Sequence, residues 1–263
     1  NWQKLDASKL SALAQTSSMY DAQGELMSEL RGAENRNIVS LDEIPMHTRQ
    51  AFLAAEDLRF YEHRGIDVYR ILGALRSNIK NGTLAEGAST ITQQLAKLTH
   101  LSAEKTIRRK LEEIHLAFQI EAAYSKDEIL AMYLNTVYFG RGAYGIQAAA
   151  QAYFGVDVSA LTLNQSASLA AIIKAPSVYA PHINPSSNRS RRQYILSVME
   201  DNGFITQEEA REARGESVWV LAREAEKQSY GWYIDEALRE SAELLGLSAD
   251  EVIQGGFEIH TAY

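Results

Sequence analysis

Helix-start signals recur along this chain and constrain its fold more than any other feature. A serine or threonine stands three residues before a glutamate or glutamine at Ser40–Glu43, Ser125–Glu128, Thr162–Gln165, Thr206–Glu209 and Ser248–Glu251. This is the spacing of the capping box, in which two side chains satisfy backbone N–H groups at a helix N-terminus. Apolar residues between these signals recur at the period of one helix face, as at Ile107, Leu111, Ile114 and Phe118. The sequence therefore predicts a mainly α-helical fold over most of residues 40–210.

The two ends of the chain have a different texture. Residues 17–30 alternate around an Asp-Ala-Gln-Gly turn, which predicts a short hairpin, and residues 255–263 alternate like a strand. Between them, residues 163–175 are mostly apolar but too short to span a bilayer, so they predict a buried core helix that Pro176 ends. Three of the four prolines fall within residues 176–190, which predicts a loop there.

Charge is unevenly distributed along the chain. The net charge is −8, and residues 200–263 hold 15 acids against 5 bases, a net of −10, so the first 199 residues sum to +2. Within residues 97–110, five cations oppose only Glu104, namely Lys97, Lys105, Arg108, Arg109 and Lys110. Two interpretations stay open at this point: a solvated helix face, or an anion site on an otherwise acidic protein.

Composition narrows the chemistry that the chain can perform. The absence of cysteine excludes a disulfide scaffold, a thiolate metal site and a cysteine nucleophile. No His-x-x-x-His or Asp-x-Asp cluster offers a metal cage, and no Gly-x-Ser-x-Gly motif suggests an α/β-hydrolase. The chain begins abruptly with Asn1 and has no apolar run of roughly 18 residues, so we interpret it as a piece of a longer protein that has lost an anchor.

Glu56 stands in the first of four segments that carry candidate chemistry, residues 56–65. An apolar helical run over residues 51–55 delivers this carboxylate at its C-terminal end, where partial desolvation raises the pKa and suits proton transfer. Gly65, two residues after His63, permits a sharp exit from the helix. Taken alone, Glu56 and Asp57 also fit a surface pair, and His63 fits a structural hydrogen-bond donor.

The second segment, residues 86–97, combines a glycine turn, a helix start and two adjacent glutamines, Gln93 and Gln94. Hydroxyl and amide donors at a helix N-terminus suit sugar or phosphate oxygens, although an ordinary capped helix has the same pattern. In the third segment, Arg109 and Glu113 lie one helical turn apart, as a surface ion pair or as a second active-site carboxylate among cations. The fourth segment, residues 126–135, by itself predicts core packing.

Together these segments resemble the peptidoglycan glycosyltransferase domain of class A penicillin-binding proteins, family 51 of the glycosyltransferases. The family motifs Glu-Asp-x-x-Phe-x-x-His-x-Gly, Gly-x-Ser-Thr-x-Thr-Gln-Gln, Arg-Lys-x-x-Glu and Lys-x-x-Ile-x-x-x-Tyr-x-Asn occur in order at 56–65, 87–94, 109–113 and 126–135. A weaker fifth motif matches at Arg191, with Ile195 and Leu196. The resemblance covers about residues 40–200.

The resemblance implies a role for each matching residue. Glu56 is implied as the general base, and Glu113 as the second carboxylate that assists departure of the lipid pyrophosphate. Substrate contacts are implied for Asp57, Phe60, His63, Ser89, Thr90, Gln93, Gln94, Lys97, Lys105, Arg109 and Lys110. Tyr133 and Asn135 are expected to support the site. Relatives often carry an arginine where Gly73 stands, so Arg70 or Arg76 is the expected replacement.

The resemblance also implies the surroundings of the reaction. The expected fold is lysozyme-like and helical, with short β segments at both ends and a small hydrophobic subdomain around residues 66–85 that faces the membrane; a plain core helix is the alternative there. The expected domains are a strand and linker segment at 1–39, the glycosyltransferase at 40–200 and an acidic helical linker at 201–263. The expected partners are lipid II, the growing glycan strand, the extracytoplasmic membrane surface and cell-wall synthesis proteins, without nucleic acid. The sequence requires no cofactor or metal, but a divalent cation, Mg²⁺ or Mn²⁺, could sit at the pyrophosphate.

Two further functions fit parts of the sequence. A lysozyme-like or lytic enzyme also uses two carboxylates on a helical fold, but its uncharged leaving group has no need of the cations at 97–110. A non-catalytic wall-binding module is expected to have lost one of the two glutamates, and both are present. The glycosyltransferase is therefore the preferred hypothesis.

Overall fold

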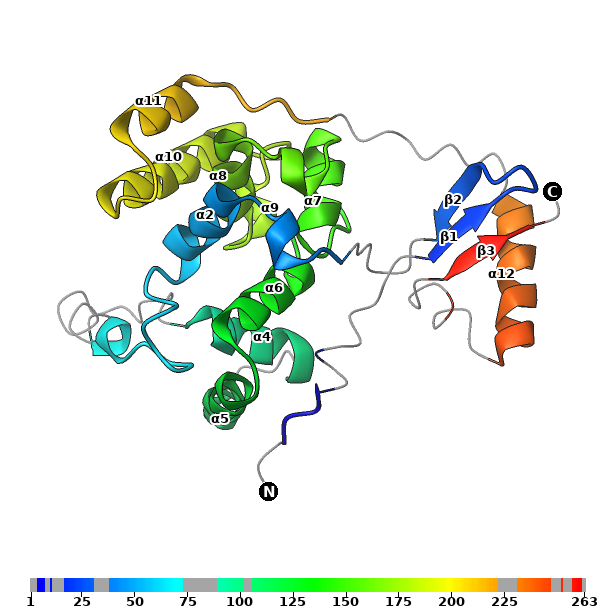
Figure 1. Cartoon of the computed structure of the whole chain (residues 1–263), viewed down its shortest axis with the longest axis horizontal. Helices are drawn as coiled ribbons and strands as arrows, with labels where there is room; N and C mark the ends of the chain where they lie inside the picture. The colour runs from blue at the N-terminus through cyan, green and yellow to red at the C-terminus, as the bar shows by residue number, and fades with distance from the viewer. Residues whose placement is uncertain are drawn as a thin grey trace.

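The computed structural model describes residues 4–7, 10, 17–30, 38–72, 89–101, 106–221, 231–246, 252 and 257–261. Three parts of the sequence-based expectation lie outside these residues: Lys105, Arg76 with the rest of the 73–85 stretch, and the Ser248–Glu251 box. A body of helices and a separate small β-sheet lobe make up the described chain (Figure 1).

Helices dominate the body, as predicted. They are η1 (Leu41–Glu43), α2 (Met46–Glu56), α4 (Ile91–His100), α5 (Ile107–Ala123), α6 (Lys126–Thr136), α7 (Ile146–Phe154), η2 (Val158–Ala160), α8 (Leu163–Ile172), α9 (Pro176–Tyr179), α10 (Pro185–Asp201) and α11 (Gln207–Gly215). The capping boxes predicted at Ser40, Ser125, Thr162 and Thr206 are confirmed. The described chain has a further capping box between Thr90 and Gln93, at the start of α4.

The predicted core helix, α8, lies at the centre of the body. Its residues from Ser166 to Ile172 are all buried, and α2 and α10 pack against it. Helix α11 packs on α10 and α8, while α4 packs on α5 and α6. The predicted buried helix is therefore confirmed, but it ends at Ile172 and not at Pro176, which begins α9. Helices α2 and α10 are fixed relative to each other by packing on α8.

A three-stranded sheet forms the small lobe, in the order β2-β1-β3. The predicted hairpin is confirmed as β1 (Ser17–Tyr20) antiparallel to β2 (Leu26–Leu30), and the predicted terminal strand as β3 (Glu258–His260). Strand β3 pairs in parallel with β1, so segments from the two ends of the chain share one sheet beside α12 (Gly231–Leu245) (Figure 1).

Two local expectations differ from the structure. The loop predicted over residues 176–190 is confined to 180–184, because Pro176 and Pro185 each occupy the first turn of a helix, where the missing N–H costs nothing. The apolar residues of α5 do share a face, but Ile107 is 85%, Leu111 49% and Phe118 45% exposed. The buried residues of α5 are Glu113, Leu116, Ala117 and Ile120.

Candidate active site

Helix α2 delivers Glu56 to the edge of the core. The preceding residues Ala51, Phe52, Leu53 and Ala54 are buried, and Glu56 is the last residue of the helix with 16% of its side chain exposed. Burial raises the pKa of Glu56 above its ordinary value, because the charged form loses hydration. A hydrogen bond from Gln94 and the charges of Arg191, Arg70 and Lys174 offset part of this effect. The predicted upward shift is thus confirmed.

An amide and a phenol orient the Glu56 carboxylate. The Gln94 Nε2 donates to Glu56 Oε2 at 2.8 Å, and the Tyr133 hydroxyl donates to Gln94 Oε1 at 3.2 Å. Because the Gln94 oxygen already accepts from the phenol, its amino group is left to face the carboxylate. Tyr133 is fully buried, and burial raises its pKa well above the usual value, so the phenol stays protonated as a donor. Tyr133 therefore acts on Glu56 through Gln94.

Asp57 fastens the end of α2 to the start of α4. Its side chain is buried, and Oδ2 accepts a bond from the Ile91 backbone N–H at 2.9 Å. The His63 Nε2 lies 3.0 Å from both carboxylate oxygens of Asp57. Phe60, between them in sequence, is fully buried. All three side chains have internal partners that hold the site, and their substrate contacts stay predictions.

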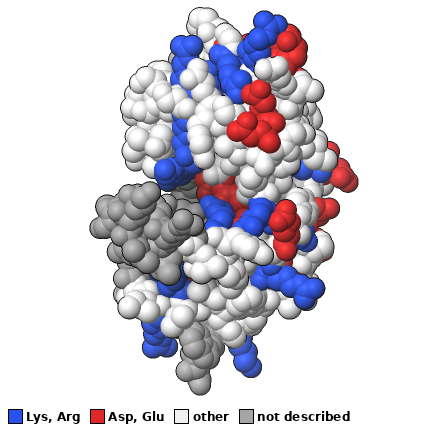
Figure 2. Space-filling view, turned by 90° about the vertical axis from the view of Figure 1, so that its left-hand side faces the viewer, with Lys and Arg blue, Asp and Glu red and all other residues white. Residues whose placement is uncertain are grey.

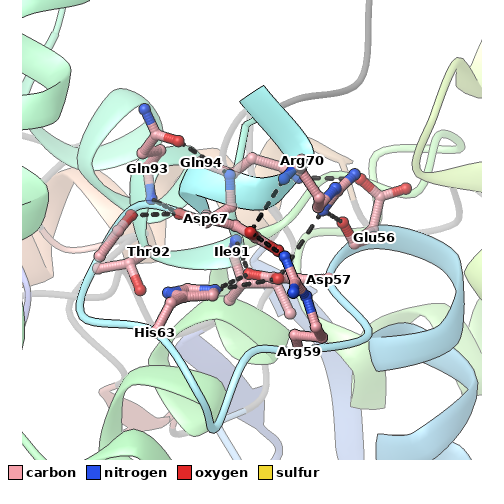
Figure 3. Close-up of polar contacts among 12 residues, drawn as sticks. Glu56, Asp57, Arg59, His63, Asp67, Arg70, Ile91, Thr92, Gln93 and Gln94 are labelled. Atoms are coloured by element: carbon pink, nitrogen blue, oxygen red, sulfur yellow. Dashed lines mark hydrogen bonds and ion pairs between the residues drawn. The ribbon is translucent and has the colours of Figure 1, made fainter. Parts of the chain in front are cut away.

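Arg70, one of the two arginines expected to replace the one that relatives carry at position 73, reaches the end of α2, and its contact with the donor stays a prediction. Its guanidinium Nη1 donates to the Glu56 backbone carbonyl and lies 3.8 Å from Asp57 Oδ1 (Figure 3). Asp67 holds the start of the helical residues 68–72 by accepting from the Arg70 backbone N–H at 3.0 Å. Burial raises the pKa of Asp67, but this backbone bond and the Arg59 guanidinium lower it by more, so the net pKa lies below the usual value.

The start of α4 is built around Thr90. Its hydroxyl donates to the Gly65 carbonyl at 2.6 Å, and its N–H donates to Gln93 Oε1 at 3.0 Å. Gly65 has a φ of +90°, and a Cβ there would lie 3.2 Å from the Ala117 backbone of α5. The helix exit predicted at Gly65 is wrong, because α2 already ends at Glu56 and Gly65 lies in the turn segment that follows. Gln93 is buried in the capping box, whereas Gln94 reaches Glu56.

Cations from α5 surround Glu113. The Lys110 ammonium contacts Glu113 Oε1 and donates to the Ser89 hydroxyl at 2.9 Å. The Arg109 Nη1 lies 3.8 Å from Glu113 Oε2. Glu113 itself is buried, with 4% of its side chain exposed. Through Ser89 this cluster adjoins the start of α4, the helix that carries Gln94. Lys97, on the same helix, is exposed.

Two cations outside the four main motifs, Arg191 and Lys174, also act on the Glu56 carboxylate. The Arg191 Nη2 of α10 lies 3.6 Å from Glu56 Oε1, and the charge of Lys174, just after α8, also lowers the pKa of Glu56. The weak fifth motif had marked Arg191, but its neighbourhood to Glu56 depends on how α10 packs on α2 and α8. In Figure 1 the C-terminal end of α2 lies between α10 above and α5 below. Figure 2 shows a recessed acidic surface with lysine and arginine side chains around it.

Asn135 supports the site from behind. Its amide nitrogen donates to the Val39 carbonyl, its oxygen accepts from the Val39 N–H at 3.0 Å, and the side chain is buried. Asn135 thereby fixes the segment that leads into α2. With Tyr133 holding Gln94, both residues have structural partners of the kind expected for supporting roles.

Comparison with known proteins identifies the family. The family model described as Transglycosylase matches residues 23–200. The chain belongs to this family. It is 43% identical over 256 residues to penicillin-binding protein 1F of Bacillus subtilis, which covers 97% of this chain and 36% of the relative. It is 41% identical over 243 residues to penicillin-binding protein 1A of Escherichia coli, which covers 92% of this chain and 28% of the relative.

These matches define the kind of domain and its extent. The chain spans roughly a quarter to a third of the curated relatives' length. It is a transglycosylase domain of the penicillin-binding-protein type, and its enzyme class is peptidoglycan glycosyltransferase. The crystal structure of penicillin-binding protein 1A from Haemophilus influenzae shares its fold, with a TM-score of 0.53 at 23% identity, over 95% of this chain and 27% of that one.

Proposed function

We propose that this domain polymerises lipid II, a lipid-linked disaccharide-peptide, into β-1,4-linked glycan strands. In this reaction the 4-hydroxyl of an acceptor sugar attacks the anomeric carbon of the donor and displaces the lipid pyrophosphate. Because the donor linkage is α and the product β, a single inverting displacement is implied. Family membership supports the reaction class, and the environment of Glu56 supports its place as the reacting carboxylate.

Glu56 is the proposed general base. A carboxylate whose pKa is raised by burial holds the proton of a sugar hydroxyl more readily than a solvated one. Gln94 fixes one oxygen at 2.8 Å, so the other oxygen, which faces Arg191 at 3.6 Å, remains accessible to an incoming hydroxyl. This single observation, a partly desolvated and oriented carboxylate in a recess that lysine and arginine side chains surround, carries the proposal.

Glu113 and its cations form the proposed leaving-group site. The departing pyrophosphate develops negative charge, which preorganised cations stabilise in the transition state. Lys110 and Arg109 contact Glu113 and keep its carboxylate close to the pyrophosphate that they bind. The hydroxyl of Ser89, already a partner of Lys110, is a further contact, and Lys97 and Lys105 are proposed to extend this surface.

A divalent ion has little to bind at Glu113. Both carboxylate oxygens face a cation, and in the described parts of the chain no group of three or more histidine or acidic residues is placed so that it could hold a metal ion. A metal ion there would be held mainly by the pyrophosphate oxygens, and repelled by Lys110 and Arg109. We therefore propose that Lys110 and Arg109 stabilise the charge of the leaving group.

Exposed apolar side chains support contact with a membrane. Val68, Tyr69 and Leu72 are 53%, 76% and 58% exposed, whereas a plain core helix would bury them. Val68, Tyr69 and Phe118 line one pocket of about 400 Å³, which brings this segment and the apolar face of α5 to one surface. No helix in the described ranges is long and apolar enough to cross a bilayer. We propose that this surface touches the extracytoplasmic leaflet, where the lipid-linked substrate and other cell-wall synthesis proteins would be met.

A polymerisation assay tests the function. The domain is incubated with fluorescent lipid II in detergent or vesicles, and the product is separated by size before and after muramidase digestion. We expect muramidase-sensitive polymer from the wild type and none from Glu56→Gln. Cleavage of preformed glycan without polymer would favour a lytic enzyme, and turnover of neither substrate by a folded domain would favour a wall-binding module.

A further inference from the structure

The pocket of about 400 Å³ beside residues 59–69 carries charged groups that contact with hydrocarbon alone does not use. Two arginines and two acidic residues line it, so their formal charges cancel. Arg59 and Asp67 satisfy each other as an ion pair. Glu62 and Arg64 have no ion partner among the described residues. The pocket therefore offers a carboxylate and a guanidinium to a ligand.

His63, which also lines the pocket, adds a hydrogen-bond acceptor. Its Nε2 lies 3.0 Å from both carboxylate oxygens of Asp57, so this nitrogen is the one that donates. In the neutral imidazole Nδ1 is then an acceptor, and this atom is buried without a hydrogen-bond partner. Since a buried polar atom without a partner costs stability, a ligand N–H that reaches Nδ1 would recover that cost.

We infer that this pocket binds the headgroup of a phosphatidylethanolamine molecule from the membrane leaflet. The ammonium of this lipid carries three N–H donors, which suit the Glu62 carboxylate and His63 Nδ1, while its phosphate suits Arg64. The apolar lining residues Val68 and Phe118 are 53% and 45% exposed and can meet its acyl chains. The inference rests on the proposed membrane contact and gives that contact a specific lipid.

Other ligands match the lining less well. Choline has no N–H to donate and is held by aromatic faces, but the Arg59 guanidinium already lies over the Tyr69 ring, 4.6 Å from its centroid. An anionic head such as that of phosphatidylglycerol brings a phosphate near Glu62 without an ammonium to offset the repulsion. A soluble dianion such as pyrophosphate would meet a lining whose charges cancel, and it has no use for apolar side chains.

Vesicle binding by flotation is the main test. The reference is vesicles of phosphatidylcholine alone, and in two further sets part of this lipid is replaced by phosphatidylethanolamine or by phosphatidylglycerol. Glu62→Gln removes the carboxylate at an exposed position, so the fold should be kept. Glu212→Gln is the matched control, because it makes the same change of charge at an exposed position of α11 that does not line the pocket.

We expect the wild type to bind vesicles with phosphatidylethanolamine more tightly than those of phosphatidylcholine alone. Glu62→Gln should lose about fivefold in affinity for the ethanolamine vesicles, which corresponds to an ion pair of about 1 kcal/mol at a partly exposed site. It should not lose affinity for the glycerol vesicles, and Glu212→Gln should keep the wild-type preference. A preference for ethanolamine that survives in Glu62→Gln, or an equal loss of affinity for phosphatidylglycerol, would overturn the inference.

A short-chain lipid tests the pocket without a membrane. Dihexanoyl-phosphatidylethanolamine is kept below the concentration at which it forms micelles, and its binding is followed by saturation-transfer NMR. The wild type should bind it more tightly than Glu62→Gln does, and more tightly than it binds the choline analogue. Equal binding of the two lipids by the wild type would contradict recognition of the ammonium.

These measurements fail separately from the proposed function. If the wild type polymerises lipid II but does not prefer phosphatidylethanolamine, the lipid site is wrong and the function stands. If the preference depends on Glu62 but no polymer forms, the function is wrong and the lipid site stands. If the short-chain lipid binds but vesicles of every composition do not, the membrane contact is wrong and the pocket still recognises the headgroup.

Discussion

Replacing Gln94 by methionine removes the hydrogen bond that orients the general base without changing the charge of the site. The lost bond joins Gln94 Nε2 to Glu56 Oε2 at 2.8 Å, and it favours the ionised carboxylate. Its loss therefore raises the pKa of Glu56 further, so less of the base is ionised at a given acidic pH. The acid limb of the kcat/KM profile should move to higher pH.

The size of the effect follows from the surroundings of Glu56. A hydrogen bond to a charged group contributes about 1.5–3 kcal/mol, and about 1.4 kcal/mol corresponds to a factor of ten. Arg191 remains 3.6 Å from the carboxylate, and 16% of the Glu56 side chain stays open to water, so the lower end of that range applies. We expect kcat/KM on the acid limb to fall about tenfold, with a smaller loss on the alkaline side.

The assay is the initial rate of polymer formation from fluorescent lipid II at low substrate concentration across the pH range. Tyr133→Phe should move the acid limb in the same direction by a smaller amount, because it removes only the 3.2 Å bond that orients the Gln94 amide. Gln207→Met, at an exposed position of α11, is the control and should leave the profile unchanged. An acid limb that stays in place, or moves to lower pH in Gln94→Met, would refute the reasoning.

Three further substitutions probe the rest of the account. Glu56→Gln should raise Tm at mildly alkaline pH, by about 2–4 °C for each kcal/mol gained in the free energy of unfolding. The reason is that the pKa of Glu56 is raised in the folded state, so the ionised side chain destabilises the fold above that pKa. The gain should vanish at acidic pH, where Glu56 is neutral, and a gain at every pH would contradict this sign. Lys110→Ala should lower kcat about a hundredfold through loss of leaving-group stabilisation, whereas Arg108→Ala, at a 77% exposed arginine, should not; equal losses would mean that Lys110 has no special place. Gly65→Ala should lower the free energy of unfolding by about 1–3 kcal/mol or more, because φ is +90° and the new Cβ meets the α5 backbone at 3.2 Å. Gly203→Ala, where φ is +70° and no atom lies near the new Cβ, should lower it less in the same denaturant titration. The reverse order would contradict the packing at Gly65.

Local signals in the sequence predicted most of the helices because capping and apolar spacing act within a few residues. The boxes at Ser125, Thr162 and Thr206 predicted helix starts that the structure confirms. The prolines at 176 and 185 were misjudged, since proline disrupts a helix interior but fits its first turn, and sequence alone does not reveal which position it takes. The parallel pairing of β1 with β3 also escaped prediction, because it joins residues more than two hundred positions apart.

The candidate site was predictable only where one segment carries it. Glu56 at the end of an apolar helix and the Arg109–Glu113 pair were visible in the sequence. The contacts of Glu56 with Gln94 and Arg191 were not, because they arise where α4 and α10 pack beside α2. The internal partners of Asp57 and Gln93 likewise follow from tertiary packing and not from motif spacing.

A carbon-13 NMR titration of the Glu56 carboxyl group, set beside the pH profile of kcat/KM, tests the central claim most directly. We predict that the Glu56 carboxyl titrates above the ordinary pH range of a glutamate, and that its midpoint coincides with the acid limb of the rate profile. A midpoint at or below the ordinary value, or an acid limb that follows another group, would contradict it.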